Sequence, residues 1–295
     1  TNGNFTGIRI MGIFQNNLLA ASAAAASAGG GAFYSHQIEQ SVRIPRSTTS
    51  DGGANGGGLY RNSSGTITDN KKFTFSTWLK KGATDLNFLQ VLLGQLVGGG
   101  GKNIYLDYES SDYFDRIATL GDWGSTTYAY PPKLRDISGW YHLAFIFDTT
   151  QSTQADRQKV YINGTLQGVG DTTNNWSLNS SIYWNSSFSG TYHYSIGFQG
   201  FSHFEGNSYG FYGYLAETMG IDGQDVAISD LGETKNGVWI PKEYTGSFGG
   251  NGYHLKYENA SDLGNDSSGN NNDFTTVNLD ADHQVLDSPT VGTGS

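Results

Sequence analysis

The chain has 295 residues, a formal net charge of -10 and no cysteine. Its 42 glycines, 14% aromatic residues and only 5 prolines favour many strands joined by tight turns. The acidic balance and the lack of a Lys/Arg cluster argue against nucleic acid or an anionic membrane as partners, because both require clustered cations. The lack of cysteine excludes disulfide and thiolate chemistry, and no apolar run approaches the roughly 18 residues of a membrane span.

Residues 1–32 differ in composition from the rest of the chain. They contain "NNLLAASAAAASAGGG" (Asn16–Gly31), an Ala/Ser block that ends in glycines and offers few large side chains to a core. Two interpretations stay open: a flexible leader, or an anchor arm that orders only against a partner. The apolar residues with which such an arm would contact its partner are Ile13, Phe14, Leu18 and Leu19.

From Phe33 onward, apolar residues alternate with a period of two, which predicts strands. In "YHLAFIFD", which begins at Tyr141, both faces are apolar. One face carries Tyr141, Leu143, Phe145 and Phe147. The opposite face carries Trp140, His142, Ala144 and Ile146. This strand is therefore expected at the centre of a sheet, packed between two layers. No segment beyond the leader sustains a helical period, so we expect an all-β chain.

The segment "KVYINGTLQG" predicts a β-hairpin. Its Asn163-Gly164 pair can adopt the positive φ angles of a type I′ turn, whose twist matches that of the flanking strands. In this interpretation, Val160 and Ile162 face Leu166 across the ladder.

The order of these two motifs resembles the laminin-G-like, concanavalin A-like sandwich. A wider set of motifs resembles lectin-like structural proteins of tailed bacterial viruses, and the resemblance spans Met11–Thr290. The motifs are "MGIFQNNLLAA" (Met11–Ala21), "QIEQSVRI" (Gln37–Ile44), "FTFSTWLKKG" (Phe73–Gly82), "GYLAETMGIDGQ" (Gly213–Gln224), "GVWIPKEYTGSFGGNGYHL" (Gly237–Leu255) and "DLGNDSSGNNNDFT" (Asp262–Thr275).

The resemblance implies a two-sheet antiparallel jelly-roll sandwich over residues 33–290, with an N-terminal anchor arm (1–32) and a short C-terminal tail (291–295). It places the protein in the virion, as a capsid decoration, a head fibre or a tail-fibre component. The expected partners are other virion proteins, reached through the arm. Further copies of the chain, often as a trimer, and a host surface glycan are also expected.

The resemblance also extends to glucanases, whose catalytic strand carries a Glu-X-Asp-X-X-Glu pattern that is absent here. Glu217 stands alone, with Leu215 and Met219 two residues away on its strand. The six His are scattered, and His142 is interpreted as a structural imidazole bonded to a neighbouring strand. We therefore expect no enzyme. A virion structural protein ranks first, a carbohydrate-binding module second and a glycoside hydrolase last.

Two further segments are candidate sites. A loop rich in Asp and Asn is either a calcium site or a metal-free turn held by side-chain-to-backbone bonds. Its candidate ligands are Asp262, Asp266, Asn270, Asn272 and Asp273. An aromatic and amide-rich stretch is either a glycan or partner surface, or a set of rings that caps the sandwich or lies in a subunit interface. Its rings are Trp176, Tyr183, Trp184 and Phe188.

Overall fold

The computed structural model divides the chain into two compact units, Thr1–Ser35 and His36–Ser295. It describes residues 33–46, 56–61, 65–83, 89–97, 100–107, 116–120, 126–129, 134, 136–170, 176–182, 184, 194–198 and 210–290. The predicted anchor arm, with Ile13, Phe14, Leu18 and Leu19, lies outside these residues, as does the tail from 291. Of the first unit only Phe33–Ser35 are described, and the rings of Phe33 and Tyr34 meet edge to face there.

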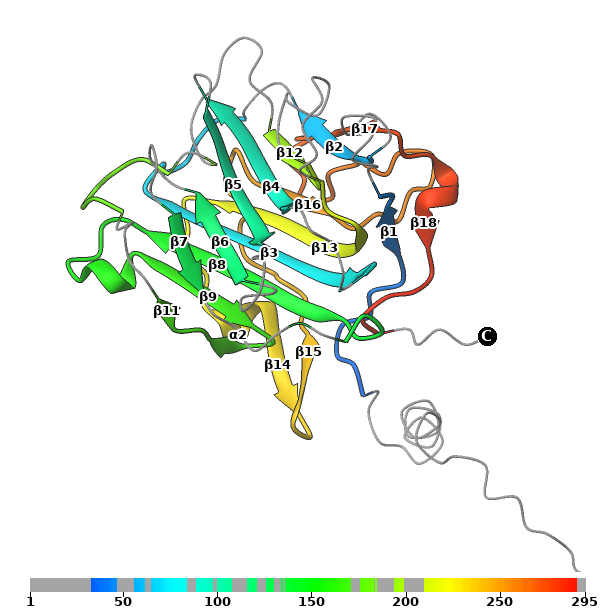
Figure 1. Cartoon of the computed structure of the whole chain (residues 1–295), viewed down its shortest axis with the longest axis horizontal. Helices are drawn as coiled ribbons and strands as arrows, with labels where there is room; N and C mark the ends of the chain where they lie inside the picture. The colour runs from blue at the N-terminus through cyan, green and yellow to red at the C-terminus, as the bar shows by residue number, and fades with distance from the viewer. Residues whose placement is uncertain are drawn as a thin grey trace, which may run out of the picture. The chain divides into compact units, whose positions relative to one another are not determined.

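The second unit is built from two antiparallel sheets (Figure 1). The first has the order β10 (Thr165–Leu166), β9 (Gln158–Ile162), β8 (Tyr141–Asp148), β3 (Lys72–Lys81), β13 (Gly213–Asp222), β1 (Ser41–Ile44) and β18 (Gln284–Val285), with β16 (Tyr253–Leu255) also paired to β13. The second has the order β11 (Val169–Gly170), β7 (Thr126–Ala129), β6 (Arg116–Leu120), β5 (Gly100–Asp107), β4 (Gln90–Val97), β12 (Tyr194–Ile196), β2 (Gly58–Arg61) and β17 (Thr275–Val277). This architecture confirms the all-β antiparallel sandwich.

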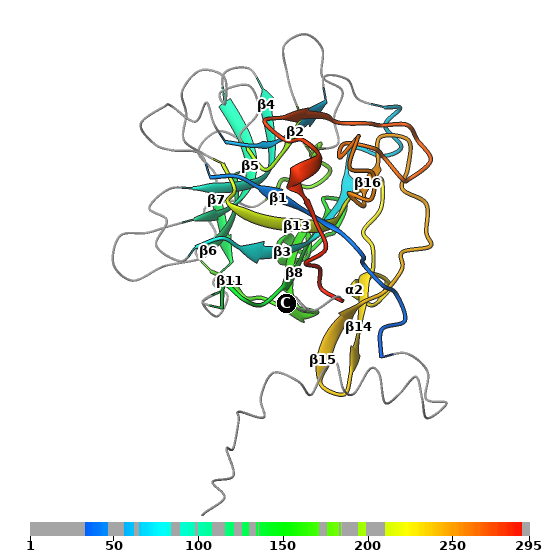
Figure 2. The same ribbon diagram turned by 90° about the vertical axis from the view of Figure 1, so that its right-hand side faces the viewer.

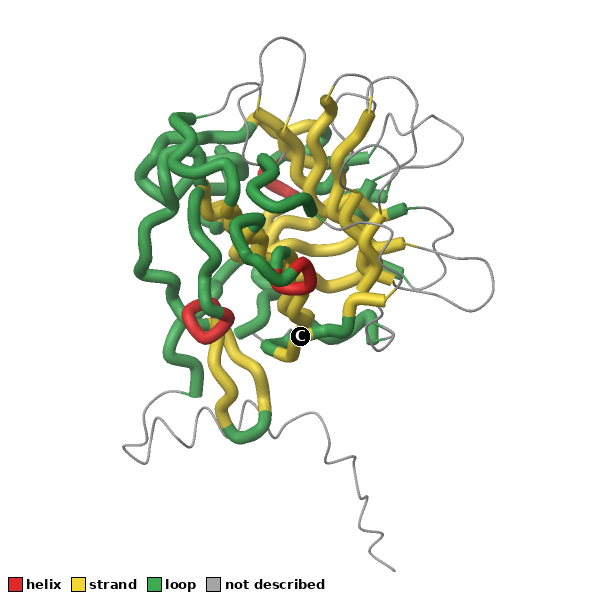
Figure 3. The backbone as a smooth tube through the Cα atoms, turned by 90° about the vertical axis from the view of Figure 1, so that its left-hand side faces the viewer, coloured by secondary structure: helices red, strands yellow, loops and turns green. Residues whose placement is uncertain are grey.

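The remaining elements are short. A hairpin of β14 (Gly232–Lys235) and β15 (Val238–Pro241) projects from one end of the sandwich (Figure 2). The helical pieces are α2 (Ile228–Leu231) and the 3-10 turns η2 (Gln154–Asp156) and η5 (Ala281–His283), drawn in red in Figure 3. Within the described ranges, no helix has the length and apolar character needed to cross a membrane.

The main core joins the two sheets. Alternate residues of β8 (Leu143, Phe145 and Phe147) are fully buried in one cluster with residues of the second sheet such as Leu93 and Ile104. The opposite face of β8 is also buried, and β8 lies between β9 and β3. The prediction of a central strand that is apolar on both faces is therefore confirmed.

The predicted type I′ turn is also present. Asn163 has a φ of 46° and Gly164 a φ of 74°, as that turn requires. The predicted pairing around it is wrong, because the two-residue turn sets Ile162 opposite Thr165 and therefore Leu166 opposite Tyr161. Leu166 is 55% exposed, on the face away from the core.

The outer face of the first sheet is largely covered by the segment that follows β13. Ala144 of β8 packs there with Met219 and Ile221 of β13 and with Val226 and Leu231 of the covering segment. Tyr244 and Phe248 pack against the same cluster from the chain that follows β15. This second layer positions the site described next.

Candidate functional site

An open cavity of about 450 Å³ lies where β13 ends, α2 begins and the chain leaves β15. We call it the Tyr244 pocket. Its lining residues are Gly223, Gln224, Asp225, Val226, Ala227, Asp230, Lys242, Glu243, Tyr244, Thr245 and Gly246.

A buried carboxylate anchors the turn that leads into the pocket. Asp222 ends β13, and its Oδ2 accepts hydrogen bonds from the backbone N–H groups of Thr68 (2.7 Å) and Asn251 (2.9 Å). Gly223 follows with a φ of 77°, which turns the chain away from the sheet. Thr74 of β3 then anchors the next residues, because its hydroxyl donates to the carbonyl of Gln224 and accepts from the N–H of Val226. The turn "DGQD" (Asp222–Asp225) at the end of β13 therefore contributes Gly223, Gln224 and Asp225 to the lining of the pocket.

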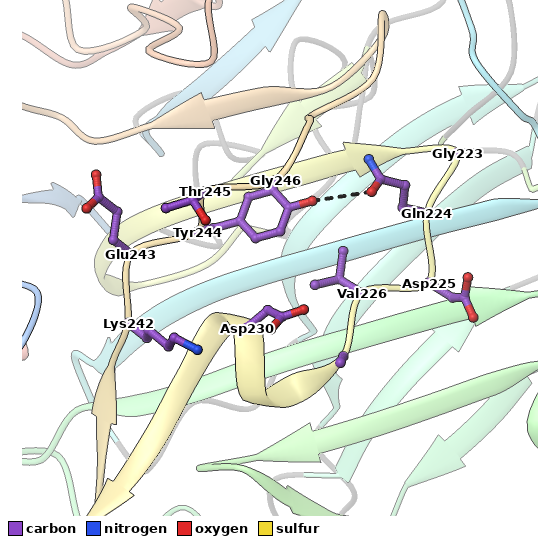
Figure 4. Close-up of a pocket in the computed structure, with 11 residues that line it drawn as sticks. Gly223, Gln224, Asp225, Val226, Asp230, Lys242, Glu243, Tyr244, Thr245 and Gly246 are labelled. Carbon is purple, nitrogen blue, oxygen red and sulfur yellow. Dashed lines mark hydrogen bonds between the residues drawn. The ribbon is translucent and has the colours of Figure 1, made fainter.

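The Tyr244 ring forms one wall (Figure 4). It packs edge-on against Phe248, with ring centroids 5.2 Å apart, and its hydroxyl donates to the carbonyl of Ser247 (2.9 Å). Burial raises the pKa of Tyr244, so the phenol stays a hydrogen-bond donor at neutral pH. Lys242 is exposed and donates from Nζ to the carbonyl of Ser229, beside α2.

The pocket thus combines an aromatic ring with donors and acceptors of both charges. Asp225, Asp230, Lys242 and Glu243 are exposed in the pocket, and Asp225 Oδ1 accepts from Lys72 Nζ at 2.7 Å. A ring face in a pocket with exposed polar groups suits a ligand with one apolar face and several hydroxyls, such as a sugar. Sequence reasoning missed this site because its residues come from two segments, 223–230 and 242–246, that the β14–β15 hairpin brings together.

The two described rings of the predicted glycan surface, Trp176 and Trp184, lie outside the Tyr244 pocket and are internal. Trp184 is fully buried and Trp176 is 5% exposed, and both rings pack against Phe147 of β8 at centroid distances of 5.2 and 5.7 Å. Trp176 Nε1 also donates to the side-chain oxygen of Gln158. The prediction of exposed stacking rings is therefore wrong for these two residues, because they fill the core. Tyr183 and Phe188 lie outside the described residues.

The candidate calcium loop is organised by hydrogen bonds. The carboxylate of Asp266 accepts from the backbone N–H groups of His254, Ser268 and Asn272, and from the Ser268 hydroxyl. The amides of Asn270 and Asn272 donate to backbone carbonyls, including that of Gly252. These contacts match the metal-free turn.

The other two candidate ligands give no cage of oxygens either. Asp273 Oδ1 accepts from the Asp266 N–H at 2.8 Å, and Asp262 is exposed. Within the described part of the chain, no group of three or more His, Asp or Glu side chains could hold a metal ion. The residues of the loop do not fit a calcium cage.

Glu217 is the single carboxylate on its strand, as the sequence predicts, but two histidines from other segments lie beside it. Its carboxylate lies 2.6 Å from His254 Nε2 and 3.5 Å from His36 Nε2. Burial raises the pKa of Glu217, but the hydrogen bonds and charges of the two imidazoles outweigh it and lower that pKa to about 2. Glu217 is only 5% exposed and sits at a β-bulge with a φ of 48°, so it stabilises the bulge rather than facing a ligand.

His142 has the structural role that the sequence indicates. Its Nε2 lies 2.9 Å from Ser76 Oγ on the neighbouring strand β3, and its Nδ1 accepts from Trp239 Nε1 at 3.1 Å. Burial lowers the pKa of His142 to about 3. The neutral ring therefore carries its proton on Nε2 and joins β8, β3 and β15.

Residues 51–204 match the family described as the concanavalin A-like lectin/glucanases superfamily. The match covers more than half of the chain, which therefore belongs to this superfamily. The Tyr244 pocket lies outside the matched segment. No curated protein matches the chain.

Three solved structures are similar to parts of the chain. The heptameric SAP-like pentraxin from Limulus polyphemus is 13% identical, with 66% of this chain and 81% of that chain covered and a TM-score of 0.45. Domain 4 of the extracellular arabinanase AbnA from Geobacillus stearothermophilus, solved with arabinotriose, is 15% identical, covers 59% and 71%, and has a TM-score of 0.36. The sialidase CBM40 of Ruminococcus gnavus, bound to sialyllactose, is 13% identical, covers 61% and 89%, and has a TM-score of 0.31.

Proposed function

We propose that this protein is a non-enzymatic structural protein of a tailed bacterial virus, whose lectin-like sandwich is displayed on the particle and binds carbohydrate in the Tyr244 pocket. The virion assignment is supported by the order of the sequence motifs between Met11 and Thr290. Carbohydrate binding is supported by membership of the lectin/glucanase superfamily and by the pocket itself. A carbohydrate-binding module with no role in a particle is the second candidate, supported by the same pocket.

The observation that carries the binding proposal is the Tyr244 ring among polar side chains. Asp230 and Lys242 approach it from different elements, and an open cavity of about 450 Å³ falls within the range of small-molecule sites. Neutral hydroxyls can accept from the ammonium and donate to the carboxylate, while the ring covers an apolar sugar face.

The arrangement of carboxylates supports binding rather than hydrolysis. Retaining glycosidases hold two carboxyl groups about 5 Å apart and facing the same bond. In the Tyr244 pocket, the side chains of Asp225 and Glu243 point in different directions away from the ring (Figure 4). Asp225 is also ion-paired with Lys72.

A glycan array tests the binding proposal. The full chain is expected to bind a defined set of glycans, and Tyr244→Ala and Asp230→Asn are each expected to weaken that binding about tenfold or more. Asp262→Asn, an exposed substitution in the hydrogen-bonded loop, is the matched control and should bind normally. Equal binding by all four proteins would contradict the site.

Removal of the leader tests the virion proposal. Deletion of Thr1–Gly31 should abolish co-sedimentation with virus particles and leave binding on the array unchanged. Full attachment of the deleted protein to particles, or no attachment of the intact one, would contradict it. The homo-oligomer, with a trimer as the first expectation, stays a prediction that light scattering can check.

A further inference from the structure

A second cavity of about 450 Å³ lies on another part of the molecule, across β1, β3 and β13. We call it the Arg43 pocket. Its lining residues are Arg43, Pro45, Arg46, Lys80, Lys81, Gly82, Ile137, Tyr212, Gly213 and Tyr214. None of them lines the Tyr244 pocket.

The strand register builds a row of side chains across this cavity. Arg43 of β1 lies opposite Tyr214 of β13, and Tyr214 lies opposite Lys80 of β3. Residues directly opposite on adjacent strands project from the same face of a sheet, so the three side chains stand in line. Lys80 Nζ lies 5.7 Å from the centroid of the Tyr214 ring. The row therefore presents cation, aromatic ring and cation in order.

The Arg43 pocket concentrates positive charge in an acidic protein. Among the described residues that line it are two Arg, two Lys and no Asp or Glu, although the chain has a net charge of -10. Lys80 is neutralised by Asp287 at 2.7 Å, and the buried Lys81 donates to the carbonyl of Leu134. Arg43 and Arg46 are exposed.

The sequence alone does not show that these four cations line one pocket. The four cations occur in the sequence as two separated pairs, so they form no Lys/Arg cluster there. The antiparallel order of β1, β13 and β3 brings the two pairs together.

Aromatic rings give the Arg43 pocket a second kind of contact. The Tyr212 ring packs directly over Gly82, where a Cβ atom would collide with it. Tyr214 is half-buried, and Ile137 is 45% exposed beside the cavity. Two guanidinium groups next to rings suit a ligand with both an anionic group and a ring face, since guanidinium binds carboxylate and phosphate oxygens in pairs.

We propose that the Arg43 pocket is a binding site for an acidic saccharide, with Arg43 and Arg46 on its anionic group and Tyr212 and Tyr214 against its ring. The anionic group can be a uronate carboxylate or a sugar phosphate, which share this chemistry. The net charge of -10 disfavours an extended polyanion such as nucleic acid, because the remaining surface repels it. The proposal does not depend on the Tyr244 pocket.

Calorimetric titration of the full chain with three probes tests the proposal: trigalacturonate, its fully methyl-esterified form, and mannose 6-phosphate. We expect binding of trigalacturonate, mannose 6-phosphate or both, at least tenfold tighter than binding of the neutral ester. The affinity should fall as salt is raised, because the attraction between ligand and cations is screened. The probe that binds more tightly identifies the anionic group. No binding of either acid, or equal binding of the ester, would overturn the proposal.

Variants separate this site from the other one. Arg43→Gln should weaken binding of the acid about tenfold and Arg43→Lys should retain part of it, because Lys keeps the charge without the paired donors. Lys256→Gln, which removes a cation outside both pockets, is the matched control and should bind normally. Arg43 is exposed, so thermal melts of its variants should match those of the parent. Equal binding by Arg43→Gln, or tighter binding of DNA or of anionic vesicles than of the acidic saccharides, would refute the assignment.

Discussion

His142 is a buried imidazole whose two nitrogens are both hydrogen bonded while the ring is neutral. The folded protein lowers its pKa to about 3, whereas an unfolded chain gives a His about 6.5. Between these values the unfolded state binds the proton and the folded state does not, so the free energy of unfolding falls as pH falls from 6.5 towards 3. We expect a loss of roughly 2 kcal/mol from this residue between pH 7 and pH 5, measurable by urea denaturation.

The variant His142→Gln isolates this contribution. An amide can accept from Trp239 and donate to Ser76 at any pH, so the variant should be less stable at pH 7 but lose less stability on acidification. Other titrating groups contribute equally to parent and variant, so the difference between their pH profiles reports His142. Parallel profiles would show that His142 does not change its protonation on unfolding.

At the scale of elements, the hairpin between β9 and β10 depends on one glycine. Gly164 has a φ of 74°, and a Cβ there would collide with the indole of Trp239. Gly164→Ala should therefore lower the free energy of unfolding by about 2–4 kcal/mol, through backbone strain and steric overlap together. Chemical denaturation gives this value directly.

Two other glycines distinguish the cost of backbone strain from the cost of steric overlap. Gly237, in the turn between β14 and β15, has a φ of 80° but open space around it, so Gly237→Ala should cost about 1 kcal/mol. Gly168 is exposed with open space and no positive φ, and Gly168→Ala should change stability by less than about 0.5 kcal/mol. A cost at Gly164 no larger than at Gly237 would mean that the contact with Trp239 is unimportant.

Elements of this kind were predictable because their signals are local. The alternation at Tyr141–Asp148 and the Asn163-Gly164 pair each act within a few residues, and both predictions are confirmed. The burial of Trp176 and Trp184 was not predictable, because an aromatic ring among Asn and Ser fits a core and a surface equally well. The Arg43 pocket depends on the order of β1, β13 and β3, which no short segment encodes.

At the scale of the whole molecule, the sandwich extends beyond the segment that matches the superfamily. Residues 51–204 contribute β3 and β8, but β13, β1, β16 and β18 of the first sheet come from outside that range. Strand β13 is central, since it pairs with β3 on one side and with β1 on the other. Without it, the buried edge of β3 would lose its hydrogen-bonding partner.

The surroundings of Arg61 also depend on residues outside the matched segment. It lies on β2 of the second sheet, and its guanidinium stacks within about 5.5 Å of the rings of Tyr194, Tyr253 and Phe274. Its Nη2 also donates to the carbonyl of Asn251 at 2.8 Å. Three of these four partners follow residue 204, so an excised matched segment would leave this buried cation in an incomplete core.

We therefore expect a fragment of residues 51–204 to lack cooperative unfolding, whereas a fragment of residues 36–290 should unfold in one transition near the midpoint of the full chain. The physical reason is that the longer fragment keeps all described strands of both sheets and all members of the main core cluster, and the shorter one loses the central strand of the first sheet. Circular dichroism during urea denaturation distinguishes the two. A sharp transition in the 51–204 fragment would show that β3–β8–β9 and the second sheet without β17 fold in the absence of β13, and that the strands outside the fragment are an addition to a self-sufficient core.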